Sequence, residues 1–373
     1  MLSSRVAMTA ADFQAAGLYD PGARNAAERL ELLEWLVAQG ATLDDLREAQ
    51  RRWGALSGVA GDLALRSGQR LTLAEIAARS GLSVEEIVRI NLAAGFPPPE
   101  GDQATLDAET AVTFATWAAG AALFGEAAML HFMRVLGSSL ARVAEAAVSL
   151  FLANVEAPIV ERHAGELALA QANLRAVQSL DTIPSVVRTM LRSHMEVAIR
   201  RLRVVRPDRR TADTVRVTVG FVDLVGYTRL TQQLDAHELG ALVQRFEALA
   251  SDIATARDGR VVKLVGDAVM FVTSSAGAGC DIALALLERF ADDPTVTPRG
   301  GLAEGHLLAR GGDYYGPAAN LASRAGELAV PREILVTAEV AEAGGDRFRF
   351  EPAGRRVLKG FEAPVALYAV SRR

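Results

Sequence analysis

The chain has 373 residues, half of them hydrophobic and 23% charged, and its 45 acidic and 40 basic side chains give a formal net charge of -5. This length predicts two domains, because domains usually contain roughly 100 to 200 residues. The weakly acidic balance excludes the strongly basic field of many nucleic-acid-binding proteins. The single cysteine, Cys280, excludes an intrachain disulfide and a cysteine metal site. Together with an N-terminus that does not resemble a secretory signal, it predicts a cytoplasmic location.

The N-terminal half has a helical pattern. Apolar residues recur every three or four positions from Ala26 to about Arg203, which predicts an all-α domain over residues 1–205. The most apolar stretches, 111–132 and 143–160, are interrupted by glutamates and therefore predict no membrane span. The helices over 105–160 are apolar around much of their circumference, so we expect them to be buried. We favour a dimer core over a pocket for an apolar ligand such as a fatty acid.

Residues 73–87 resemble a helix–turn–helix, in which Gly81 makes the turn and Ser83 caps the second helix. DNA binding is the functional interpretation of such an element. The second helix begins with Glu85 and Glu86, which would face the phosphates of DNA. These charges favour a packing role and predict no nucleic-acid partner.

A basic segment, 200–213, contains Pro207 and marks the change to a different pattern. Proline after a basic helical end stops a helix, so we place the domain boundary near residue 206. From Val215 to Phe221, apolar residues alternate with Arg216, Thr218 and Gly220. This period of two predicts a strand over 215–223 with one buried face.

The rest of the second domain, 206–373, alternates between helical and strand patterns. Helices are expected at 228–234, 236–257, 276–291 and 317–328, and strands at 299–309, 333–337, 347–358 and 365–371. A hairpin has arms at 260–265 and 268–273, with Gly266 and Asp267 as its turn. This βαββαβ order predicts an α+β fold of helices over one mainly antiparallel sheet.

Two aspartates end neighbouring strands of this predicted sheet. Asp223 closes the first strand and Asp267 lies in the hairpin turn, so we expect them to converge. A pair of carboxylates suits two Mg²⁺ ions bridged to phosphate oxygens. Gly226, Tyr227 and Thr228 form a turn into a helix start, where free backbone N–H groups suit a triphosphate.

Three motifs carry a resemblance to the class III nucleotidyl cyclases over residues 212–371. They are 221–228 (FVDLVGYT), 263–270 (KLVGDAVM) and 312–316 (GDYYG) followed by 320–324 (NLASR). The resemblance implies that Asp223 and Asp267 hold two divalent cations, Mg²⁺ or Mn²⁺. It also implies that Asn320 and Arg324, four apart on a helix, orient the ribose and stabilise charge on the α-phosphate.

The same resemblance assigns base recognition to Lys263 and Asp313. An ammonium donor serves adenine N1 and a carboxylate accepts from the 6-amino group, which favours ATP over GTP. The implied products are cyclic AMP and pyrophosphate. Lys359 resembles a late lysine that contacts the triphosphate.

In this family the two aspartates come from one catalytic domain and the base-reading pair, asparagine and arginine come from the other. One chain carries the full set, which implies a homodimer with its sites at the interface. A diguanylate cyclase, suggested by 311–315, is disfavoured because Tyr314 stands where an acidic residue belongs. A non-catalytic scaffold would be favoured only by loss of a catalytic residue.

Residues 1–205 resemble the helical autoinhibitory module of two-domain bacterial class III cyclases. The likeness rests on Leu30–Leu36 and on Ser193, His194 and Met195 just before the catalytic domain. It implies control of activity by pH or by lipid. His194 is the candidate pH-sensitive residue, because histidine titrates near neutral pH and a linker helix must change its packing when the catalytic halves rotate.

Overall fold

A computed structural model describes residues 8–66, 68–98, 103–205, 214–227, 231–291, 293 and 296–373, which form two compact units that divide between Leu191 and Arg192. The predicted domain boundary at residue 206 and the predicted phosphate-binding residue Thr228 lie outside the described residues. Much of the helix expected at 228–234 also lies outside them, and residues 231–234 form a turn.

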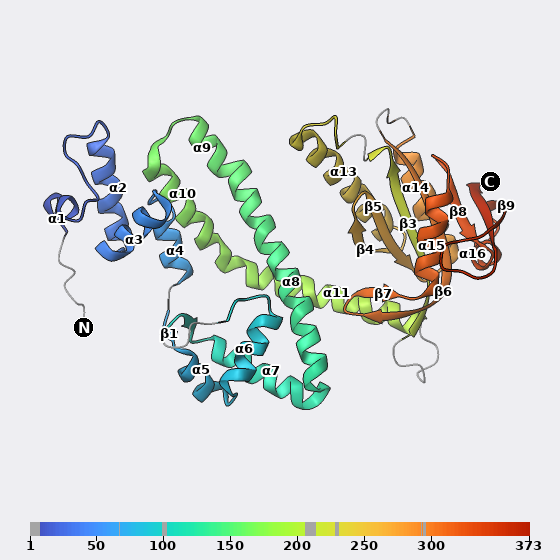
Figure 1. Ribbon diagram of the computed structural model, residues 1–373, viewed down its shortest axis with the longest axis horizontal. Coiled ribbons are helices and arrows are strands. Elements are labelled where there is room, and N and C mark those ends of the chain that lie inside the picture. The colour runs from blue at the N-terminus through green and yellow to red at the C-terminus, as the bar shows by residue number, and fades with distance from the viewer. Residues whose placement is uncertain are drawn as a thin grey trace. The chain divides into compact units, whose positions relative to one another are not determined.

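The first unit is helical, as the sequence predicted (Figure 1). Its helices are α1 (Ala10–Ala15), α2 (Ala26–Ala38), α3 (Leu43–Trp53), α4 (Val59–Leu65), α5 (Leu73–Ser80), α6 (Val84–Ala93), α7 (Thr110–Phe124), α8 (Glu126–Phe151), α9 (Ala157–Glu161), α10 (Gly165–Ser179) and the start of α11 (Ile183–Val205). A two-stranded ribbon that the sequence did not predict pairs β1 (Arg70–Leu71) with β2 (Leu106–Asp107).

Two apolar cores stabilise this unit. Helices α1 to α4 and α10 pack around Phe13, Leu33 and Leu36, which are fully buried. Helices α5 to α7 pack around Ile76 and Ile87. The two cores share no residue.

The helix–turn–helix predicted at 73–87 forms as α5 and α6, with Gly81 in the left-handed conformation at φ 75°. The hydroxyl of Ser83 accepts from the N–H of Glu86, and the Glu86 carboxylate accepts from the N–H of Ser83. This reciprocal cap gives Glu86 a structural task at the start of α6. Glu85 remains exposed.

The long apolar helix of the first unit, α8, is largely uncovered within the single chain. Phe114 and Trp117 on α7 are buried, but Phe124, Phe132 and Leu150 are 67%, 55% and 67% exposed within the single chain. No described element of the same chain covers that part of α8, so its burial in a dimer core stays a prediction.

The same helix bears on the prediction that no segment spans a membrane. The continuous helix Glu126–Glu161 is long and apolar enough to cross a membrane by length and composition, and its most apolar window is 0% buried. The glutamates along it are too few in that window to exclude a span. One such helix does not distinguish a membrane span from the contact surface of an assembly.

The second unit contains one sheet with helices (Figure 1). Its strands are β3 (Thr214–Val225), β4 (Arg260–Val265), β5 (Ala268–Thr273), β6 (Thr297–Arg310), β7 (Asp313–Tyr315), β8 (Ile334–Thr337), β9 (Phe348–Arg356) and β10 (Val365–Arg372). Its helices are the end of α11, α13 (Ala236–Thr255), α14 (Ala276–Arg289), α15 (Pro317–Leu328) and α16 (Ala338–Ala343). The strand order is β4-β5-β3-β6-β8-β10-β9, with β7 paired to β6, and among the strands that the structure describes only β6 and β8 run parallel. The α+β fold with a mainly antiparallel sheet is confirmed.

Strand β3 is buried on both faces, and the expectation of one buried face was wrong. Val222 and Leu224 pack with α13, α14 and α16 on one face. Val217 and Val219 pack with α15 on the other. Because helices cover both faces, Thr218 is also fully buried.

Helix α15 lies directly against β6 through small residues. An added Cβ at Gly301 would come within 2.3 Å of the Ala322 carbonyl oxygen and of the Gly326 nitrogen. Ala322 and Ala325 are fully buried. The helix backbone therefore sits as close to the strand as glycine and alanine allow.

This close approach predicts that Gly301→Ala lowers the free energy of unfolding by about 1–3 kcal/mol, because backbone atoms must move to admit the methyl group. Gly240→Ala is the matched control, since Gly240 is exposed on α13 with nothing within 4 Å of an added Cβ. That control should be neutral or raise stability by about 0.5–1 kcal/mol. Urea denaturation measures both. Equal stability of the two variants would contradict the packing argument.

Candidate active site

The two predicted metal-binding aspartates lie at the same end of the sheet. Asp223 on β3 pairs in register with Ala268, the first residue of β5. Asp267 directly precedes Ala268 in the two-residue turn between β4 and β5, where Gly266 has φ 64°. The structure therefore brings the two carboxylates together, as predicted. Both lie at the end of strands that are hydrogen-bonded to β5 in a defined register.

Arg299 is the residue that the sequence analysis missed. It lies on β6 opposite Asp223. Its Nε donates to Asp223 Oδ1 at 3.0 Å and to Oδ2 at 3.3 Å, and its Nη2 donates to Oδ2 at 3.3 Å. Its Nη1 donates to the carbonyls of Glu327 and Ala329, both at 3.0 Å, at the end of α15.

Burial dominates the electrostatics of Asp223. Removal from water raises the pKa of Asp223 above its usual range, and this effect outweighs the ion pair with Arg299, which lowers it. The charge of Asp267 raises the pKa further. Two hard oxygen donors on fixed backbone, close enough for their charges to interact, fit a divalent cation.

The predicted base-reading residues touch each other. Lys263 Nζ lies 2.5 Å from Asp313 Oδ2. Burial raises the pKa of Asp313, but the hydrogen bond from Lys263 and that from the N–H of Tyr314 together outweigh it, so the pKa lies below its usual range. Asp313 is therefore an ionised acceptor above that pKa.

Two local features that the sequence analysis did not predict align this pair. A register shift between Val261 and Lys263 puts a bulge in β4, and bulges re-aim side chains. Gly311 and Gly312, with φ 61° and 81°, turn the chain back so that β7 pairs with the end of β6. In addition, Arg260 Nη2 donates to the Gly312 carbonyl at 2.7 Å.

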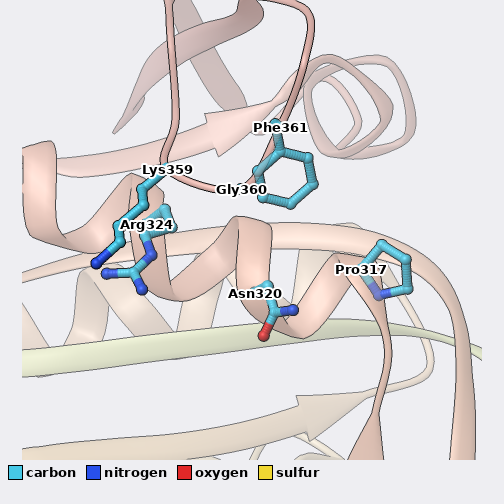
Figure 2. Close-up of a pocket in the computed structure, with 6 residues that line it drawn as sticks. All are labelled: Pro317, Asn320, Arg324, Lys359, Gly360 and Phe361. Carbon is cyan, nitrogen blue, oxygen red and sulfur yellow. The ribbon is translucent and has the colours of Figure 1, made fainter.

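Three further predicted residues line one pocket of about 310 Å³: Asn320, Arg324 and Lys359. Figure 2 shows the side chains of Arg324 and Lys359 extending in the same direction, below the loop that carries Phe361. Arg324 Nη1 is held by Glu327 at 2.6 Å. Two cations and an amide in one small pocket suit an anionic, sugar-bearing ligand. Asp223, Asp267, Lys263 and Asp313, which the structure also describes, are not part of its lining.

The remaining predicted residues occupy different surroundings. Gly226 follows β3 with φ 90°, and Tyr227 packs partly buried against the main core of the sheet unit. The Thr231 N–H donates to the Tyr227 carbonyl at 2.9 Å. His194 is exposed on α11.

Comparison with known proteins decides the family. The sequence pattern described as "Adenylate cyclase regulatory domain" matches residues 11–200, and that described as "Adenylate and Guanylate cyclase catalytic domain" matches residues 210–372. The chain belongs to the adenylate cyclases. The resemblance seen in the three motifs is thus confirmed for the second domain, and that of residues 1–205 to a cyclase regulatory module is confirmed for the first.

Relatives of this cyclase cover similar lengths. Protein Rv2212 of Mycobacterium tuberculosis is 36% identical over 362 residues, which is 96% of this chain and 93% of that protein. The "pH-sensitive adenylate cyclase MT1302" of M. tuberculosis is 31% identical over 376 residues, 95% of this chain and 91% of the other. An "Adenylate cyclase" of Streptomyces coelicolor is 33% identical over 283 residues, 75% and 73% of the two chains.

The contact between Lys263 and Asp313 predicts a measurable titration in this cyclase. Lys263→Met should raise the pKa of Asp313 toward its usual range, because the ammonium group provides the largest effect that lowers it. The wild-type pair should stay intact above the ordinary value of 3.8 and weaken as the pH falls through the lowered pKa. Carboxyl ¹³C NMR titration measures both variants. Lys359→Met removes a lysine from the pocket of Asn320 and Arg324 and should leave the pKa of Asp313 unchanged.

Proposed function

We propose that this cyclase converts ATP into 3′,5′-cyclic AMP and pyrophosphate. The ribose 3′-oxygen attacks the α-phosphorus in line, the bond from that phosphorus to the β-phosphate oxygen breaks, and the 3′-hydroxyl proton is released. The observation that carries the choice of ATP is the contact between Lys263 and Asp313. An ammonium donor beside an ionised acceptor complements N1 and the 6-amino group of adenine, whereas guanine offers a donor and an acceptor in the reverse order.

The other side chains of the site support the same chemistry. Asp223 and Asp267 are the residues that would hold divalent cations, Mg²⁺ or Mn²⁺, which would activate the 3′-hydroxyl and neutralise phosphate charge. Arg324 would stabilise negative charge on the α-phosphate, and Asn320 would orient the ribose. Lys359 would contact the triphosphate, and its place in the same pocket supports that role.

Turnover of ATP and of GTP by the full chain, each with Mg²⁺ and with Mn²⁺, tests this proposal. We expect cyclic AMP to form at least about a hundredfold faster than cyclic GTP, because guanine would leave both polar partners, Lys263 and Asp313, mismatched. Asp267→Asn should abolish turnover while the circular dichroism spectrum stays unchanged. Comparable rates with both nucleotides would remove the assignment of Lys263 and Asp313.

A homodimer is the second part of the proposal. The pocket formed by Asn320, Arg324 and Lys359 does not include the two aspartates of the same chain. A polyanionic nucleotide needs both sets, so we propose that each site takes its aspartates from one chain and the pocket from a second copy. The exposed apolar surface of α8 supports a further contact between the copies, and a fatty acid at that surface has no support among the described contacts.

The shared site predicts complementation between two inactive variants. Asp267→Asn and Arg324→Ala should each be inactive, and a heterodimer of the two should contain one intact site. An equal mixture that exchanges chains freely should therefore recover roughly a quarter of wild-type activity. Asp267→Asn mixed with Asp223→Asn is the matched control, because both changes affect the same half and should give no recovery. Recovery in the control, or none in the test mixture, would contradict the shared site.

Regulation by the first domain is the third part. We place the boundary between the regulatory domain, 1–205, and the catalytic domain, 206–373, and the pattern matches at 11–200 and 210–372 support it. Helix α11 runs from the first unit into the second. Its Arg201 donates from Nη2 to the Gly259 carbonyl at 2.7 Å, directly before β4 with Lys263. We propose that this helix transmits a pH-dependent signal and that the protein acts in the cytoplasm.

Such coupling predicts that activity of the full chain depends on pH between about 5.5 and 7.5 more steeply than that of residues 206–373, and rises on acidification. His194→Ala should flatten the profile of the full chain, because histidine charges in this range. His163→Ala, which lies in the first unit before the start of α11, is the matched control and should not. Superimposable profiles of the full and shortened chains would remove the pH switch. An unchanged profile in His194→Ala would remove only that residue.

A further inference from the structure

The oxygens of Asp223 that a metal would need already have a partner. Arg299 approaches both of them, at 3.0 Å and 3.3 Å, with Nε and Nη2. The two side chains are equally sheltered, each 27% exposed. A guanidinium held side-on to a carboxylate in this way is a strong and directional contact.

Arg299 is itself anchored from the other side. Its Nη1 donates to the carbonyls of Glu327 and Ala329, both at 3.0 Å. These groups lie at the C-terminal end of α15, where carbonyls lack partners within the helix and carry partial negative charge. The guanidinium therefore cannot swing away from Asp223 without leaving two further acceptors.

The position of Arg299 is set by the sheet as well as by its contacts. Arg299 and Asp223 are cross-strand neighbours in the β3–β6 register, and both strands continue on either side of the pair. The side chain that competes for the carboxylate is thus as fixed as the carboxylate itself. A cation at this position repels a second cation that approaches the same oxygens.

We propose that Arg299 is a positioning residue that holds Asp223 in the nucleotide-free chain and keeps free divalent cations out of the site until a triphosphate accompanies them. The proposal rests on the metal-binding role assigned above to Asp223 and Asp267. A cation that arrives with a triphosphate has much of its charge neutralised. The phosphate oxygens also give the guanidinium new acceptors as it gives up the carboxylate.

The test measures binding of Mn²⁺ alone to the full chain by electron paramagnetic resonance, without nucleotide. Arg299→Gln should bind Mn²⁺ at least about tenfold more tightly than wild type, since a neighbouring cation changes the proton affinity of a carboxylate by about 1–3 pH units. Arg299→Lys keeps the charge and should stay within about threefold of wild type. A gain in affinity is a result that mere structural damage would not give.

Arg216→Gln is the matched control. It removes the same charge from the same pair of strands, because Arg216 Nη2 on β3 lies 2.8 Å from Glu304 Oε1 on β6, and it is far along the strand from Asp223. Its Mn²⁺ affinity should equal that of wild type. Equal gains in Arg216→Gln and Arg299→Gln would overturn the proposal, because they would reflect net charge alone.

Two more measurements separate the possible failures. Asp223→Asn should remove the Mn²⁺ binding of the Arg299→Gln variant; if it does not, the proposed metal site is wrong. If it does, and folded Arg299→Gln binds no more tightly than wild type, only the role of Arg299 is wrong.

If Arg299→Gln does not fold, the test compares Mn²⁺ binding by the wild-type chain with and without nucleotide. Mn²⁺ affinity should rise at least about tenfold with a non-cyclisable ATP analogue, and an equal affinity without it would overturn the proposal.

Discussion

The register of strand β3 against its two neighbours is the constraint on which the site depends. A slip of β3 by one residue would move every side chain to the opposite face, where it would meet a different set of helices and lose its present packing. In the observed register Asp223 lies opposite Ala268 on one side and opposite Arg299 on the other. The nearness of Asp267 and the ion pair with Arg299 both follow from that single alignment. Val219 and Val222, at the centre of β3, are both fully buried and stabilise it from opposite faces.

Close packing of small residues connects this strand pair to the cationic pocket. With no room for a side chain at Gly301, helix α15 rests on β6 backbone to backbone. This packing fixes the distance of Asn320 and Arg324 on α15 from the sheet. It also places the last carbonyls of α15 within hydrogen-bond distance of Arg299. A change that lifts α15 would therefore disturb the pocket and the counter-ion of Asp223 together. Packing and electrostatics are not independent in this domain.

The sequence predicted those features that depend on local pattern. The strands, the turn at Gly266 and the four-residue spacing of Asn320 and Arg324 all follow from short-range periodicity. Arg299 escaped notice because its contact joins residues 76 positions apart and exists only in one strand register. The hairpin of β7 could have been found from the pair Gly311–Gly312, whereas the exposure of α8 could not, since hydrophobicity does not say what covers a helix.

The division of the charged groups explains why two copies would act as one unit. In a two-fold symmetric pair, if the aspartates of one chain face the pocket of the other, the reverse also holds, so both sites form or neither does. Any signal that moves the β4–β5 hairpin would then reach Lys263 of one site and Asp267 of the other. The bond from Arg201 on α11 to the Gly259 carbonyl, one residue before β4, meets the hairpin at its base. A displacement of α11 would in that case reach Lys263 and Asp267 together through the base of one hairpin.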